Sequence, residues 1–270
     1  EGGLDHGIIV RAGQETGLVR RRRQEHALLQ HRVEEAVERW DVTGGGLRIG
    51  LHLLTGEEQP EHRTHAVGGH RHAGFGGGRF VAFDATTLEV VQDVTVPSQV
   101  RGEEFGPMAL TVDPVGGKLY SVGLSTGEVV VLDGATGAVD RMFRFPTLNG
   151  GIGVAIDAEG RRLYATGQGS DNLIIANADT GEVLHDVYVG AGAVYVAFDP
   201  HSKLAYVASR GAGTITAVDA NGQIVANLDG GTFPNHVLPV ADGTVYAINK
   251  SRGADDPNGD QIRRLVPKTN

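Results

Sequence analysis

Short runs of alternating apolar and polar residues, separated by turns rich in Gly, Asp and Asn, fill most of the chain after residue 78. The stretch RRLYATGQGSDNLIIANADTGEV, from Arg161 to Val183, predicts two β-strands joined by a loop and followed by a turn at Asp179 to Gly181. Alternation of this kind is typical of strands, because successive side chains of a strand point to opposite faces. Most of the chain is therefore expected to be β-sheet.

The same pattern returns at a regular step. The turn-opening acids Asp113, Asp157 and Asp199 are 44 and 42 residues apart. Tyrosines keep the same step, at Tyr120, Tyr164, Tyr206 and Tyr246. Each unit contains four alternating segments, and a period of about 40–45 residues with four strands is typical of a β-propeller blade. The sequence thus predicts an all-β fold, a β-propeller of four-stranded antiparallel blades.

One blade can be assigned in detail. Its four expected strands are A, Ile152 to Ile156; B, around Leu163 and Tyr164; C, Leu173 to Ala176; and D, Val183 to Tyr188. Strand A carries small residues because it lies nearest the crowded axis. Each blade is expected to cover the apolar face of the next, since an isolated blade would leave that face in water.

These motifs resemble the YVTN-type β-propellers, and most of all the YncE-like bacterial exported proteins. The resemblance is carried by LYSVG, LYATG, AYVAS and VYAIN on strand B, by VLDGATGAV and AVDANGQIV across the C–D turn, and by FPNHV, RGEEFGPMAL and DDPNGDQIRRL. It covers about residues 78–267. It implies a seven-bladed family, of which about four and a half blades are recognisable in this chain, and a periplasmic or secreted protein for which nucleic-acid binding is one option.

Residues 1–77 have a different composition, rich in Arg, His and Gly and without Lys. Residues 24–40 have apolar positions at helical spacing and predict an amphipathic helix. Two interpretations stay open for this segment: a divergent extension, or an out-of-frame stretch of a GC-rich gene. Residues 78–270 form the propeller region, with residues 78–96 predicted as only the C–D half of a blade.

The last blade shows three expected strands before the sequence ends: His236 to Val240, Val245 to Asn249 and Gln261 to Leu265. The resemblance implies that an N-terminal segment supplies the outer strand and closes the ring. Residues 7–13, GIIVRAG, are the early candidate for this strand. Whether the ring closes is left open.

Charge and composition narrow the function. The net charge of −9 disfavours binding to a phosphate backbone, so nucleic-acid binding would need a local basic patch. The absence of cysteine excludes disulfides, thiol nucleophiles and Cys-based metal sites. No apolar run is long enough for a membrane span. The sequence starts at Glu1 without a leader, so any signal peptide is expected to have been removed or to lie outside it.

Three motifs have a possible chemistry and a plainer interpretation. HRTHAVGGHRH brings His62, His65, His70 and His72 together, but its spacing matches no closed zinc site. DDPNGDQ opens like a calcium loop at Asp256, Asn258 and Asp260, but lacks the later Gly and Glu. The run Arg20 to Arg23 lacks interleaved aromatics. Solvated polar residues are the favoured interpretation of all three, and no metal or cofactor is expected.

A binding site is predicted from the geometry of propellers. The D-to-A and B-to-C loops of every blade open on one face around the axial channel, so polar residues distant in sequence meet there. The expected ligand-binding residues are Arg101, Glu103, Glu104, Gln168, Asn172, Arg210, Asn235, His236, Lys250 and Arg252. Four of them, Arg210, His236, Lys250 and Arg252, make this face locally basic, which suits an anionic partner.

The favoured function is a non-enzymatic propeller that binds a small anionic ligand or a protein partner at this face. No catalytic residue is assigned, because the G-x-S-x-G, phosphate-loop and Rossmann motifs are absent. Two alternatives stay open. One is an enzyme or enzyme subunit, lactonase-like or quinone-dependent dehydrogenase-like, which would need an acid–base pair or metal ligands at the axis. The other is a protein-interaction scaffold.

Overall fold

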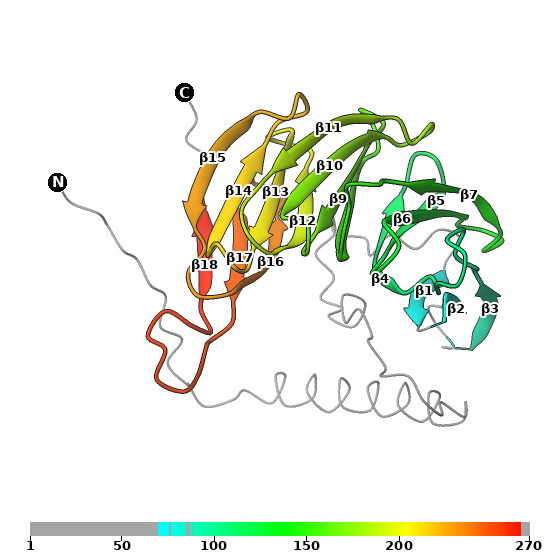
Figure 1. Cartoon of the computed structure of the whole chain (residues 1–270), viewed down its shortest axis with the longest axis horizontal. Coiled ribbons are helices and arrows are strands. Elements are labelled where there is room, and N and C mark those ends of the chain that lie inside the picture. The colour runs from blue at the N-terminus through cyan, green and yellow to red at the C-terminus, as the bar shows by residue number, and fades with distance from the viewer. Residues whose placement is uncertain (1–69, 76, 85–86, 88, 266–270) are drawn as a thin grey trace. The chain divides into compact units, whose positions relative to one another are not determined.

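The computed structural model describes residues 70–75, 77–84, 87 and 89–265, and the fold is built from these residues (Figure 1). They form eighteen β-strands in five antiparallel sheets, of which three have four strands and the first and last have three. The predicted helix at residues 24–40, the strand candidate at residues 7–13 and the arginine run at residues 20–23 lie outside the described residues. In the part of the chain described, no helix is long and apolar enough to cross a membrane.

The strands follow one another in chain order. The first sheet contains β1 (His70–Phe75), β2 (Arg79–Asp84) and β3 (Val90–Thr95). The second contains β4 (Pro107–Asp113), β5 (Lys118–Gly123), β6 (Glu128–Asp133) and β7 (Val139–Arg144). The third contains β8 (Gly151–Asp157), β9 (Arg162–Gly167), β10 (Asn172–Asn177) and β11 (Val183–Tyr188). The fourth contains β12 (Ala193–Asp199), β13 (Leu204–Ser209), β14 (Thr214–Val218) and β15 (Ile224–Asp229). The fifth contains β16 (Pro234–Pro239), β17 (Val245–Asn249) and β18 (Ile262–Leu265).

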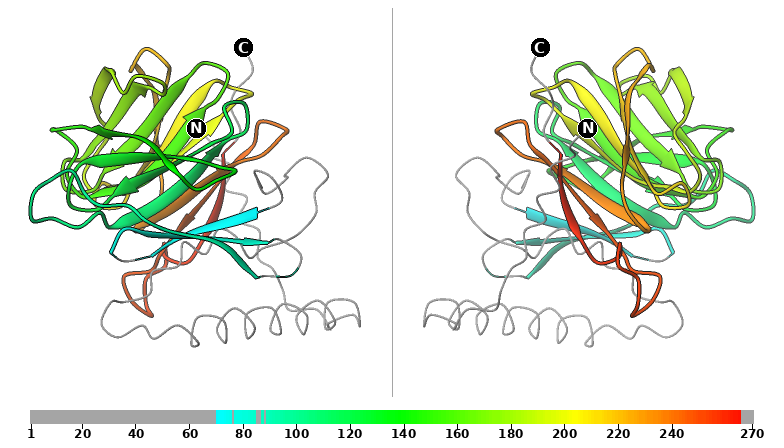
Figure 2. Two further views of the ribbon diagram at one scale, coloured as in Figure 1. Left: turned by 90° about the vertical axis from the view of Figure 1, so that its right-hand side faces the viewer. Right: turned by 90° about the vertical axis from the view of Figure 1, so that its left-hand side faces the viewer.

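The sheets are the blades of a β-propeller. Within each sheet every strand pairs with the next one in the chain, which gives the order A, B, C, D in the three four-stranded sheets, B, C, D in the first sheet and A, B, C in the last. The A strands of successive sheets lie against one another, because β8 contacts both β4 and β12, and β12 contacts β16 (Figures 1 and 2). The predicted fold class is therefore confirmed.

The repeated tyrosine of the B strand explains why one blade needs the next. Tyr120, Tyr164 and Tyr206 are at most 4% exposed. The Tyr120 hydroxyl donates a hydrogen bond to the carbonyl of Ala178 in the following blade, at 3.2 Å. The Tyr164 ring stacks on Phe198 of the following blade, with 5.5 Å between ring centroids. Each tyrosine thus fills the space between two sheets, and burial of a large aromatic ring is the main stabilising term there.

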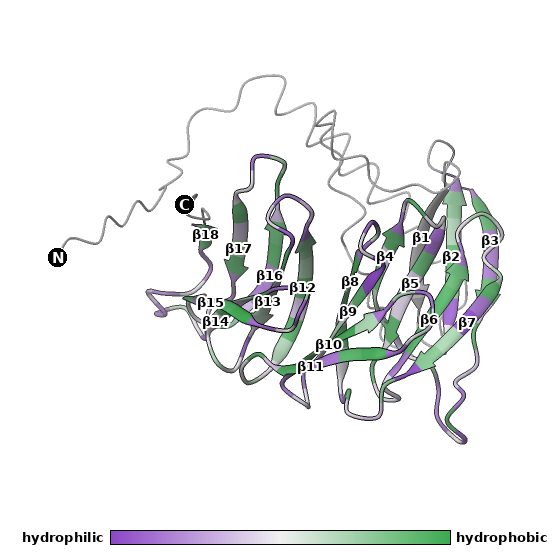
Figure 3. Cartoon of the chain, turned by 90° about the horizontal axis from the view of Figure 1, so that it is seen from above, coloured by the Kyte–Doolittle hydropathy of each residue, from purple (hydrophilic) through white to green (hydrophobic). Residues whose placement is uncertain are grey.

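The outer strands alternate between exposed and partly buried residues. Strands β3, β11 and β15 share one burial pattern, in which every second residue from the third onward is partly buried. Figure 3 shows both hydrophilic and hydrophobic stretches on β3 and β7. Strands with one face in water take this period-2 pattern.

The repeated aspartate of the A–B turn stabilises that turn from inside. The Asp113 carboxylate accepts hydrogen bonds from the backbone N–H groups of Val115 and Gly116, at 3.0 and 2.9 Å. Asp199 accepts from His201 and Ser202 in the same way. An aspartate at this position accepts hydrogen bonds from the backbone N–H groups two and three residues ahead, which the turn would otherwise leave unpaired. This role explains why the residue recurs in successive blades.

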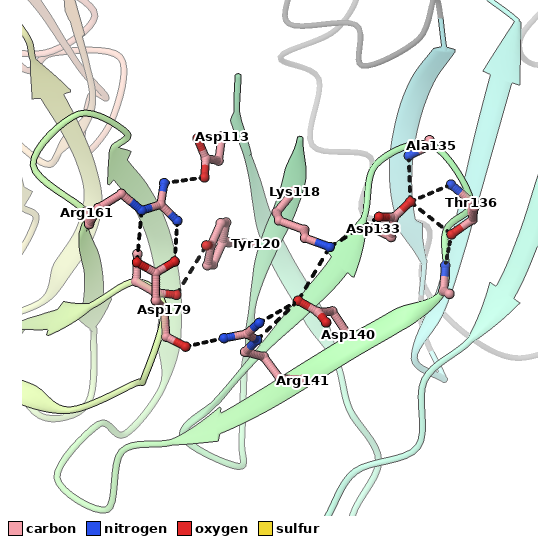
Figure 4. Close-up of polar contacts among 12 residues, drawn as sticks. Asp113, Lys118, Tyr120, Asp133, Ala135, Thr136, Asp140, Arg141, Arg161 and Asp179 are labelled. Carbon is pink, nitrogen blue, oxygen red and sulfur yellow. Dashed lines mark hydrogen bonds and ion pairs between the residues drawn. The ribbon is translucent and has the colours of Figure 1, made fainter. Parts of the chain in front are cut away.

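Arg161 connects the second and third blades (Figure 4). Its guanidinium donates to the fully buried Asp113, at 2.5 Å, and to Asp179 in the C–D turn of its own blade, at 2.7 and 3.1 Å. The hydrogen bond from Arg161 lowers the pKa of Asp179, and the two carboxylates raise the pKa of Arg161. This bidentate pairing is the strong form of an ion pair in proteins.

The first and last blades begin earlier in the chain than expected. Residues 78–96 contain β2 and β3, which are the C and D strands expected there. The first sheet has three strands, because β1 precedes Gly78 and pairs with β2 along its whole length. The sequence of β1, HRHAGF, has no apolar alternation, so the strand is recognisable only through its pairing. The first strand of the last blade begins at Pro234, two residues before the expected His236, because a β-bulge shifts its register near the start.

The last blade leaves one face in water. Val237, Val245 and Ala247 pack against the fourth sheet. The opposite face carries Leu238, Tyr246, Ile248 and Ile262, and these side chains are 38–74% exposed. Tyr246 has the same position in its blade as the three buried tyrosines, and it is exposed because no described residue forms a following blade.

We expect Asp113→Ala to lower the free energy of unfolding by about 2 to 4 kcal/mol, since it removes a buried carboxylate and leaves two backbone donors and one guanidinium contact unpaired. Urea unfolding, followed by far-ultraviolet circular dichroism, measures this change in the free energy of unfolding. The control is Asp179→Asn, which affects the same arginine at a half-exposed carboxylate and should cost about 1 kcal/mol or less. Equal losses of unfolding free energy in the two variants would contradict a special role of the buried Asp113.

Acid should weaken the second blade through Asp133. Hydrogen bonds from the Thr136 backbone and hydroxyl, with Lys118 nearby, lower the pKa of Asp133 from 3.8 to about 2. A carboxyl with a depressed folded pKa stabilises the fold above its unfolded pKa, and this contribution is lost as the pH falls towards the folded pKa. Between about pH 5 and about pH 2 the wild type should therefore lose more unfolding free energy than Asp133→Asn. Denaturant unfolding at each pH measures the two slopes, and parallel curves would refute this role.

Candidate functional site

A β-bulge marks the start of every described A strand. The pairing with the B strand shifts by one residue at the same place in four blades, and the extra residues are Met108, Ile152, Val194 and Asn235. Bulges bend a strand and redirect the neighbouring side chains, and they are frequent beside binding sites. The inner strands are thus irregular at one and the same end.

A repeated backbone hydrogen bond joins the D–A loop to the end of the B strand at this end. The N–H groups of Leu124, Gln168, Arg210 and Lys250 donate to the carbonyls of Gly106, Gly150, Gly192 and Phe233, at 2.8 to 3.0 Å. These four donors therefore have equivalent positions in successive blades. We call the surface around them the loop end. The prediction that both loop types open on one face agrees with this register.

Two neighbouring blades share contacts at the loop end. The Arg210 guanidinium, from the fourth blade, donates a hydrogen bond to the Asn235 side chain of the fifth. His236 stacks on Tyr195, with ring centroids 3.7 Å apart. Burial raises the pKa of the Tyr195 phenol, so this ring stays neutral. Three predicted site residues, Arg210, Asn235 and His236, are thus brought together between the fourth and fifth blades.

The long B–C loop of the last blade carries two more predicted residues. The Lys250 side chain is exposed, and its backbone is fixed by the bond to Phe233. The Arg252 guanidinium lies 4.8 Å from the centre of the Phe233 ring, a cation–π contact. Among described residues, neither Arg210 nor Lys250 is in an ion pair. Their positive charges therefore make the electrostatic potential at the loop end more positive.

The calcium-like motif of this loop uses its carboxylates internally. Asp256 accepts hydrogen bonds from the N–H groups of Arg252 and Asn258, and these bonds lower the pKa of Asp256. Asp260 accepts from the N–H of Ser251, at 3.0 Å. The motif thus organises its own loop. Within the described ranges no three His, Asp or Glu side chains are placed to hold a metal ion. His70 and His72 lie in β1, and His62 and His65 lie outside the described residues.

The two predicted residues of the third blade differ in exposure. Gln168 is exposed at the loop end. The side chain of Asn172 is buried in the sheet, where it accepts a hydrogen bond from the Ser170 hydroxyl and donates to Asp186, at 2.6 and 2.7 Å. Asn172 therefore holds the B–C loop against the outer strand of its own blade.

Arg101, Glu103 and Glu104 are exposed on the loop that precedes β4. This loop is attached to the fully buried Glu128, whose carboxylate accepts hydrogen bonds from the Ser98 hydroxyl and the Gln99 N–H, both at 2.7 Å. Sequence reasoning missed Glu128. One signal in the sequence could have identified it. Glu128 is an acid at the first position of a C strand, the position that Asn172 has in the next blade.

The comparisons with known proteins show the fold. No family model and no curated protein matches the chain. Among solved structures, the chain is similar to Kuenenia stuttgartiensis hydrazine synthase, with a TM-score of 0.55 and 22% identity over 65% of this chain and 49% of that one. It is similar to a chain of a mitotic checkpoint complex, with a TM-score of 0.61 and 15% identity over 74% and 60%. It is also similar to streptogramin B lyase, with a TM-score of 0.57 and 13% identity over 75% and 66%.

The chain thus spans about half to two thirds of the length of these structures. The TM-scores indicate a shared β-propeller architecture. Identities this low carry no activity over to this chain, because propellers host unrelated functions. The function must therefore be argued from the loop end itself.

We expect Glu128→Ala to loosen the loop before β4. Without the carboxylate, the Ser98 hydroxyl and the Gln99 N–H lose their acceptor, so the amides of residues 98–103 should exchange with solvent at least tenfold faster. Hydrogen exchange followed by mass spectrometry measures this. Glu104→Ala, an exposed residue of the same loop, is the control and should leave exchange unchanged. Unaltered protection in Glu128→Ala would show that other contacts hold the loop.

Proposed function

We propose that this protein is a non-enzymatic binding propeller of the YVTN type, similar to the YncE-like exported proteins, and that it binds an anionic ligand at the loop end of its fourth and fifth blades. The finer family assignment is supported by the B-strand motifs LYSVG, LYATG, AYVAS and VYAIN and by the C–D turn motifs. A periplasmic or secreted location is part of this proposal, and the absence of cysteine is compatible with it.

One observation carries the binding proposal. Arg210 and Lys250 have equivalent positions in adjacent blades, fixed by the same backbone hydrogen bond, and neither has a carboxylate partner among the described residues. The buried Arg210 Nε has no hydrogen-bond partner in the described part of the chain either. Cations held by rigid backbone and left without counter-charges attract anions.

Nearby groups favour a small ligand with both a charge and an apolar part. Aromatic rings lie close to the cations. His236 follows Asn235, the partner of Arg210, and stacks on Tyr195, and the Phe233 ring lies under Arg252. Aromatic rings next to a few fixed polar groups are typical of sites for small organic molecules. A carboxylate or phosphate that carries a ring or short chain is the ligand class that this arrangement fits best.

The double variant Arg210→Glu/Lys250→Glu tests the proposal. In the wild type, inorganic pyrophosphate as a probe should bind more tightly at low salt than at high salt, since exposed charges are screened by salt. The double variant should lose this binding by tenfold or more, because two attractive charges become repulsive. Isothermal titration calorimetry at two salt concentrations measures both effects.

The matched control is Lys203→Glu, which changes a lysine in an A–B turn, where Lys203 pairs with Glu159 at 3.0 Å. It changes the net charge by −2 away from the loop end, half the change of the double variant, and should leave pyrophosphate affinity within about twofold of the wild type. Equal losses in the control and the double variant would mean that only net charge matters, and the proposed site would be abandoned.

A further inference from the structure

The C strands of the first four sheets each pair with an outer strand. Strand β3 pairs with β2, β7 with β6, β11 with β10 and β15 with β14. In the described residues β18 pairs with β17 alone, so its other edge has no strand beside it. The Asn249 N–H donates to the Gln261 carbonyl, at 3.2 Å. Because backbone groups alternate along a strand, the N–H groups of Ile262 and Arg264 point away from β17, toward the open edge.

The outer strands of the other sheets indicate what fits beside a C strand. Their fourth residues are Asp93, Met142, Asp186 and Asn227, so three of four carry a side-chain oxygen that can accept. Each of these three bonds the C strand. Arg79 donates to Asp93 at 2.7 and 2.8 Å, Asn172 donates to Asp186 at 2.7 Å, and Thr216 lies 3.3 Å from Asn227.

Arg263 has the corresponding position in β18. In the third blade, Ile174 of the C strand pairs with Ala165 on one side and with Asp186 of the outer strand on the other. In the last blade, Arg263 pairs with Ala247, which has the position of Ala165. The other blades bury an apolar or small residue there, whereas the last blade has a guanidinium. A strand added beside β18 in the register of the other sheets would therefore place its fourth residue opposite Arg263.

Arg263 has unused capacity to donate. Its Nη1 pairs with the largely exposed Asp229, at 3.2 Å, and its Nη2 lies 3.4 Å from the Gln261 side chain. Its Nε is buried and has no hydrogen-bond partner in the described part of the chain. A buried donor without a partner costs free energy, and a second carboxylate would remove that cost. Arg161 shows that one arginine of this fold can pair with two carboxylates.

The neighbouring residue adds an apolar requirement. The fifth residues of the outer strands are Val94, Phe143, Val187 and Leu228, and each lies opposite an apolar residue of the C strand. Ile262 is the corresponding C-strand residue in the last blade, and it is 74% exposed. An apolar side chain opposite Ile262 would shield it from water.

We propose that β18 is a docking edge for an extended segment of another polypeptide, which pairs with β18 as a fourth strand and presents an Asp or Glu to Arg263 followed by a large apolar residue to Ile262. The affinity comes from the backbone hydrogen bonds of Ile262 and Arg264, and the specificity comes from the acid–apolar pair. Addition of a strand to an open sheet edge is a common mode of peptide recognition.

The probe is a fluorescent peptide with the sequence EVLHDVYVG, which is residues 182–190 of this chain and contains the acid–apolar pair of β11. Fluorescence anisotropy with the full chain should show saturable binding. A peptide with Lys in place of the Asp should bind at least tenfold more weakly, because it puts a second cation opposite Arg263. Absence of saturable binding by the original peptide would overturn the proposal.

Two variants of the protein make the test specific. Arg263→Gln should weaken peptide binding about tenfold, whereas Arg264→Gln, one residue away and on the other face of the strand, should change it less than threefold. Equal effects of the two variants would mean attraction by overall charge and would overturn the proposed register.

Hydrogen exchange of residues 262–265 identifies the occupant. In the chain alone these amides should exchange rapidly, and the peptide should protect them. Protection in the chain alone at every concentration would mean that its own residues already occupy the edge. Protection that rises with protein concentration, with a doubled mass in light scattering, would mean a second copy. Either result would overturn docking of another polypeptide.

Discussion

Each sheet of this protein has two apolar faces, and a face is stable only when another sheet covers it. The B strands are the clearest case, because their tyrosines and small aliphatic residues are buried on both sides in the second, third and fourth blades. The strand composition and the contacts between A strands follow from this requirement, whereas the last blade leaves one apolar face exposed. A blade of this kind gains most of its stability from its neighbours.

Polar interactions then set how adjacent blades meet. Aspartates shape the A–B turns, and Arg161 joins two of the blades through one buried and one half-exposed carboxylate. The loop end uses a different device, a backbone hydrogen bond repeated in four blades together with a bulge in each A strand. Because the backbone fixes these positions, the side chains at the loop end are free to differ. This explains how equivalent positions can hold Leu124, Gln168, Arg210 and Lys250.

The last blade carries residues of both proposed sites, the ligand site and the docking edge. Its loop end carries the cations of the proposed ligand site, Lys250 and Arg252, and its outer edge carries Arg263 and Ile262. The B–C loop from residue 250 to residue 261 connects the two, since it begins at the loop end and leads directly into β18. A partner strand bound at the edge would therefore restrain the end of this loop. The proposed ligand site and the proposed docking edge are distinct surfaces that share this loop.

The sequence by itself determined the repeat, the strand types and the turns, because alternation, Asp and Gly positions and the tyrosine step are local properties. It also identified the basic residues of the loop end, since the blade pattern assigns each residue to a loop or a strand. Only the tertiary structure decided what these side chains contact. Asn172 belongs inside its blade because Ser170 and Asp186 bond it, Glu128 holds a distant loop, and β1 exists through pairing rather than pattern. Such contacts join residues far apart in the chain, and no local pattern encodes them.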